Sequence, residues 1–112
     1  MKNREIVTIF VDEIPSTSID KLKLKYDHFI IGSNLYIIKY YELYSCNILI
    51  AIYNRQSNTF YVEKHASSST LKKHISLVLN KIRNAMKLNS NINLERVKDI
   101  HNQTGISLTS WR

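Results

Sequence analysis

Two of the four histidines flank a hydroxyl-rich segment, and their side chains are candidates for acid–base chemistry. His65 and His74 enclose the run ASSSTLKK, in which Thr70 stands four residues before His74. Two imidazoles can cleave RNA, one deprotonating the 2′-hydroxyl and the other protonating the leaving oxygen, because histidine titrates near neutral pH. His74 also borders an apolar helical stripe, which favours a buried structural role. A small histidine-dependent nuclease is therefore one of three functions left open.

Neither a metal nor a cofactor is predicted. Cys46 is the single cysteine, which excludes an internal disulfide and any zinc site built from a cysteine cluster. His65 and His74 have no evident third ligand in the sequence, and no cofactor-binding motif is present.

Tyrosines are concentrated in the β-like part of the chain. Strand alternation places Tyr36 and Tyr40 on one face of their strand, together with Tyr44, and Tyr41 on the other face. With Tyr61, an exposed ladder of this kind would stack unpaired nucleic-acid bases. Half-buried tyrosines that cover the sheet would explain the same pattern, since tyrosine is a good strand former.

Positive charge gathers late in the chain. The formal net charge is +7, and residues 61–112 hold nine Lys or Arg against three Asp or Glu, whereas residues 1–60 hold seven against six. Such asymmetry favours an anionic partner, DNA or RNA, although a solvated outer face would account for the same residues. The candidate nucleic-acid-binding cations are Lys64, Lys72, Lys73, Lys81, Arg83 and Lys87.

The elements that must position these residues indicate an α+β fold in a single domain, 1–112. We expect an antiparallel β-meander of four to five strands, packed against a long amphipathic helix in the C-terminal half, plus two shorter helices. The expected strands are Ile6–Val11, Phe29–Ile31, Leu35–Tyr44, Ile48–Tyr53 and Thr59–Lys64. The expected turns are Gly32–Asn34, Ser45–Asn47 and Arg55–Asn58.

Three helices are predicted around this sheet. Serine and threonine caps precede a short helix, Ile19–Tyr26, and Leu94, Val97, Ile100 and His101 suggest a last one that ends before Gly105. The long helix is marked by a stripe at helical spacing: Leu71, Ile75, Val78, Leu79, Ile82 and Met86.

The segment Tyr61–His74 resembles small uncharacterised proteins of phages, viruses and other mobile elements, through a strand, a Ser/Thr loop and a helix start in the pattern FYVEKHASSSTLKKH. The resemblance implies a viral or mobile-element origin and no particular activity.

The leading hypothesis is a non-enzymatic, nucleic-acid-binding protein. The alternative is a virus-encoded factor that binds a host protein of defence or replication, and homodimerisation through an exposed strand is compatible with either. No apolar run reaches the roughly 18 residues that cross a bilayer, so no membrane is expected, and the single cysteine fits a host-cell cytoplasm.

Overall fold

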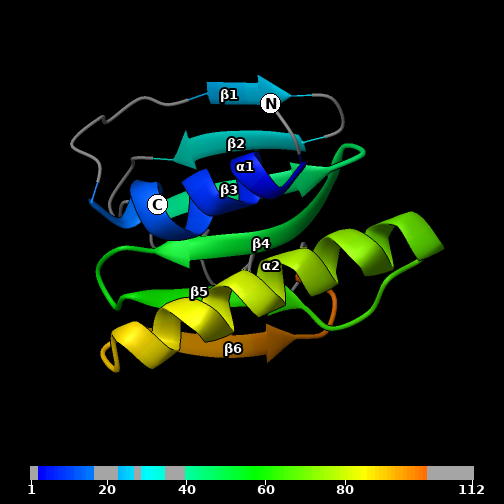
Figure 1. The fold of residues 1–112 in the computed structure, drawn as a ribbon. Coiled ribbons are helices and arrows are strands. Elements are labelled where there is room, and N and C mark those ends of the chain that lie inside the picture. The colour runs from blue at the N-terminus through cyan, green and yellow to red at the C-terminus, as the bar shows by residue number, and fades with distance from the viewer. Residues whose placement is uncertain (1–2, 17–22, 27–28, 35–39, 101–112) are drawn as a thin grey trace.

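The computed structural model describes residues 3–16, 23–26, 29–34 and 40–100, and its centre is a six-stranded mixed sheet (Figure 1). The spatial order of the strands follows the chain: β1 (Lys23–Tyr26), β2 (Phe29–Asn34), β3 (Tyr40–Ser45), β4 (Ile48–Asn54), β5 (Thr59–Glu63) and β6 (Asn93–Val97). The first five strands form an antiparallel meander, and β6 pairs with β5 in parallel. The α+β class and the antiparallel meander are confirmed, but the sheet has six strands instead of four to five, and the pairing of β6 with β5 is parallel.

The helices cover one face of the sheet (Figure 1). They are α1 (Asn3–Thr8), a π-helical turn η1 (Ile9–Glu13), a 3₁₀ turn η2 (Ile14–Ser16) and the long helix α2 (Ser69–Leu88). The predicted stripe of α2 is confirmed, because Leu71, Ile75, Val78, Leu79 and Ile82 are all buried, and Met86 packs partly against the same core.

The meander was predicted well where its signals are local. Phe60 and Val62 are buried beneath the helices while Tyr61 and Glu63 lie on the other face, as strand alternation predicts. The turns at Cys46–Asn47 and 55–58 are confirmed. The predicted turn Gly32–Asn34 is wrong, because these residues continue β2 and pair with β3.

The predicted strand Ile6–Val11 is wrong, because this segment is helical. Its β-branched residues suggested a strand, but the buried positions recur at helical rather than alternating spacing. The buried side chains are Ile6, Val7, Phe10, Val11 and Ile14. Phe10 meets Phe60 of β5 edge to face, with 5.7 Å between ring centroids. Packing on the sheet therefore outweighs local propensity here.

Two more expected helices are strands where the structure describes them. Lys23–Tyr26 forms β1, in which Leu24 packs on the core and Lys25 is exposed; the remainder of that predicted helix, 19–22, lies outside the described residues. Asn93–Val97 forms β6, because α2 returns the chain beside β5 and the backbone there completes the sheet. The predicted end of the last helix, from His101 on, lies outside the described residues.

A β-bulge alters the alternation of β4. The register shifts between Leu43 and Tyr44 of β3, so Ala51 pairs with Leu43 and Leu49 pairs with Tyr44, leaving Ile50 between them. Ile50 and Ala51 are consequently both buried on the helix-covered face.

Arg55, in the turn between β4 and β5, connects the sheet to the N-terminal helical segment. Its Nη2 donates to the Tyr41 hydroxyl at 2.7 Å and to the Ile14 carbonyl at 3.2 Å. Tyr53, the cross-strand partner of Tyr41, donates its hydroxyl to Asn58 Oδ1 at 2.8 Å. Burial raises the pKa of Tyr53; Arg55 opposes this shift and Tyr41 adds to it.

We expect the titration of Tyr53 to lower the free energy of unfolding at high pH. Tyrosine in the unfolded chain titrates near pH 10, and the pKa of Tyr53 is higher in the folded protein. The unfolded state therefore loses its proton first, so the contribution is complete below about pH 10 and is lost as the pH rises through the folded pKa. Urea unfolding between pH 8 and 11 should show a shallower decline for Tyr53→Phe than for the natural chain. Parallel profiles would contradict this account.

Candidate nucleic-acid interface

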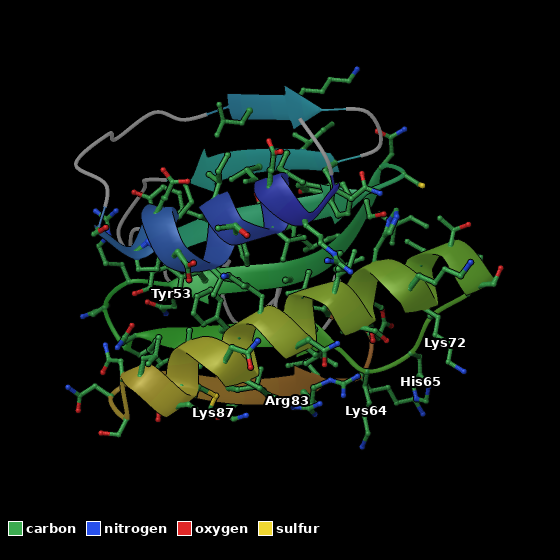
Figure 2. All side chains as sticks on the ribbon, in the orientation of Figure 1. Tyr53, Lys64, His65, Lys72, Arg83 and Lys87 are labelled. Carbon is green, nitrogen blue, oxygen red and sulfur yellow. The ribbon has the colours of Figure 1, made fainter. Side chains whose placement is uncertain are left out.

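Exposed cations line the side of α2 that faces β6. Lys72, Arg83 and Lys87 fall within about 60° of one another around the helix axis, and all three are exposed. Figure 2 shows Arg83 and Lys87 along this side of α2, and Lys64 and Lys72 toward the end where the helix begins.

Two further cations, Arg96 and Lys98, come from β6 and the turn after it. Arg96 is paired with Val62 of the core-facing row, so alternation places its side chain on the α2 side, and its Nη2 donates to the Glu63 carbonyl at 3.1 Å. Sequence reasoning missed both residues because it predicted a helix there. We call the whole set the cationic seam: Lys64, Lys72, Arg83, Lys87, Arg96 and Lys98, all exposed.

The other two predicted cations lie elsewhere on α2. Lys81 forms an ion pair with Asp12 of η1, with 3.0 Å between Nζ and Oδ2, on the opposite edge of the helix. Lys73 is exposed and is rotated about 100° from Lys72, toward the outer face. The structure therefore brings four of the six predicted cations to the seam.

The carboxylate of Glu63 accepts four backbone hydrogen bonds at the end of the seam. Oε2 accepts from the N–H groups of Lys64, His65 and Asp99 at 2.8, 3.1 and 3.1 Å, and Oε1 accepts from that of Ile100 at 2.9 Å. Charge-assisted bonds of this kind are stronger than neutral ones. One side chain thus joins the loop that leaves β5 to the turn that follows β6.

A shallow groove of about 330 Å³ opens beside this junction. The aliphatic part of its lining, which we call the floor, consists of Ile48 and Ile50 of β4 and Leu71 and Ile75 of α2. The polar part, which we call the rim, consists of Glu63, His65, Ser67, Lys98 and Asp99.

The start of α2 contributes Leu71 and Ile75 to the lining of this groove. Ser68 is the N-cap, and its Oγ accepts from the Leu71 N–H at 3.2 Å. The first turn of α2 contains no acidic residue, so the local backbone adds positive potential to that of the seam.

The two candidate histidines lie in different surroundings. His65 is exposed and lines the groove (Figure 2). His74 is buried, its Nδ1 is hydrogen-bonded to the Ser45 hydroxyl, and its ring lies 4.5 Å from that of Phe29. An imidazole enclosed in this way does not meet a substrate at the groove, so we do not propose the acid–base pair. Among the described residues, His, Cys, Asp and Glu side chains form no group of three that could hold a metal.

The tyrosines do not converge with the seam where they are described. Tyr41 and Tyr53 are buried in the core, and Tyr44 and Tyr61 are half-buried on the opposite face, packed against Leu49, Ile52 and Ile100. The prediction that Tyr41 and Tyr44 lie on opposite faces of the sheet is confirmed. Tyr61, however, covers an apolar cluster and is not an exposed stacking platform. Tyr36 and the side chain of Tyr40 lie outside the described part of the chain.

Comparison with protein-family models, with curated proteins and with solved structures returned no match. The resemblance of Tyr61–His74 to phage and mobile-element proteins therefore stays a prediction. No helix in the part of the chain that the structure describes is long and apolar enough to cross a membrane.

We expect Glu63→Ala to lower the free energy of unfolding by about 2–3 kcal/mol, because its backbone donors lose a charged acceptor. Glu95→Ala, on an exposed position of β6, is the control and should change it by less than about 0.5 kcal/mol. Urea unfolding measures both values. Amide exchange at Asp99 and Ile100 should accelerate in Glu63→Ala alone. Equal behaviour of the two variants would contradict the bridging role of Glu63.

Proposed function

We propose that this protein binds nucleic acid, DNA or RNA, through the cationic seam. The observation that carries the proposal is the set of six exposed cations on α2, on β6 and directly after β5 and β6. β5 and β6 each carry one acidic residue. The carboxylate of Glu63 is held by four N–H groups, and alternation directs Glu95 to the opposite face of the sheet from the seam.

The dimensions of the seam suit a phosphate backbone. Lys72 and Arg83 are separated by about 16 Å along the helix axis, a length over which a nucleic-acid strand presents several phosphates. Four of the six cations are lysines, which act as point charges and contact phosphate rather than reading base edges. We therefore infer binding that depends weakly on base sequence and strongly on salt.

Replacing the three seam cations of α2 tests the proposal. Lys72→Ala, Arg83→Ala and Lys87→Ala, combined in one chain, should weaken binding at low salt and reduce the slope of log K against log salt by about 2–3, since each phosphate contact contributes about 0.7–0.9. Fluorescence anisotropy with single-stranded and duplex oligonucleotides at several salt concentrations measures both quantities.

A matched control removes three exposed cations outside the seam, with Arg4→Ala, Lys25→Ala and Lys73→Ala in one chain. This variant has the same net charge as the seam triple variant. It should leave the slope unchanged if the seam is the interface, because the cations that it lacks lie outside the seam. An equal loss in the two triple variants would indicate a general effect of net charge. Absence of binding by the natural chain at low salt would refute the proposal.

An acidic protein surface is the other partner that such a seam suits, as in the alternative of a host-protein-binding factor. A pull-down from host lysate with the natural chain and the seam triple variant, repeated after nuclease treatment, distinguishes a protein partner from nucleic acid. Capture that survives nuclease and requires the seam would favour the protein partner.

A further inference from the structure

We propose that the groove at the start of α2 takes one unpaired base, so that the protein prefers single-stranded over duplex nucleic acid. This inference rests on the proposed function and adds to it the class of nucleic acid. It starts from the position of the groove, whose rim includes Lys98, a member of the seam, and Glu63, whose carbonyl accepts a hydrogen bond from Arg96.

The groove has the composition that a base requires. A base offers two flat apolar faces and a polar edge, and the groove offers an aliphatic floor with polar groups at its rim. Ile48 is the accessible part of the floor: this residue is 45% exposed, whereas Ile50 and Leu71 are buried. Ile48 is one of two large hydrophobic residues exposed in the described part of the chain; the other is Leu88, at the far end of α2.

The rim can engage the rest of a nucleotide. His65 is exposed beside the floor, and imidazole rings are among the side chains on which unpaired bases stack. Lys98 provides a cation for the adjoining phosphate. Asp99 also lines the groove, and a carboxylate accepts from the exocyclic amino group of a base but repels phosphate. The phosphate is therefore expected toward Lys98 and away from Asp99.

The size of the groove argues for one base and against a duplex. About 330 Å³ is at the small end of the range for ligand pockets and holds one heterocycle with part of its sugar. In a duplex the faces of each base are covered by stacking, so an intact double strand offers the groove no base. A duplex would then bind through its phosphates on the seam alone.

Paired substitutions of the two exposed aliphatic residues test this inference. Ile48→Ala should weaken binding of a single-stranded 12-mer by about three- to tenfold, through lost apolar contact, and leave duplex affinity and the salt slope unchanged. Leu88→Ala makes the same kind of change at the other end of α2 and should alter neither affinity. A 12-mer of abasic nucleotides with the same phosphates should bind the natural chain and Ile48→Ala equally. Anisotropy titrations at several salt concentrations measure the affinity for all three ligands and the salt slope.

The outcomes separate the two proposals. Duplex binding through the seam with no loss of single-strand affinity in Ile48→Ala would overturn the base-binding groove and leave the proposed function intact. Absence of binding to every oligonucleotide would remove both. Light scattering on the same variants tests whether a second copy of this chain occupies the groove instead. If Ile48→Ala alters the oligomeric state but not the affinities, the groove binds that second copy, and the inference is overturned.

Discussion

The parallel pairing of β6 with β5 is the constraint on which the candidate interface depends. Lys64 N–H donates to the Val97 carbonyl at 2.8 Å at one end of the pair, and Asn93 N–H donates to the Asn58 carbonyl at 3.0 Å at the other. The carboxylate of Glu63 extends this connection beyond the last paired residues. Without the pairing, Arg96 and Lys98 would not lie beside α2, and the groove would lose Lys98 and Asp99 from its polar rim.

The sequence distance between partners explains part of what could be predicted, although β1, which pairs with its sequence neighbour β2, was predicted as a helix. The strands from β3 to β5 lie close together in sequence, and their turns carry local signals, such as Cys46 and Asn47, which adopt positive φ values of 52° and 64°. The helical segment that contains Phe10 and the strand β6 were predicted wrongly, because each is determined by a contact with β5 many residues away. Local propensity carries little information on such contacts.

The candidate site was predictable in its charges and not in its shape. The excess of cations near α2 is visible in the sequence, but their division between the seam and the Lys81–Asp12 pair depends on where η1 packs. The groove combines Ile48 from the start of β4, Leu71 from α2 and Lys98 from the turn after β6, three segments without a shared motif. The number of tyrosines suggested an exposed stacking ladder, but those that the structure describes pack against apolar clusters on both faces of the sheet.

The connection through α2 also determines the direction of the helix. A helix that links two adjacent parallel strands runs back against both of them, so its amino end lies where β5 and β6 end. The helix macrodipole places the equivalent of about half a positive charge at that end. An anion that approaches the groove therefore meets a field from peptide groups as well as from ammonium groups. That share of the attraction belongs to the main chain, so it persists at any pH and remains when the side chains around it change.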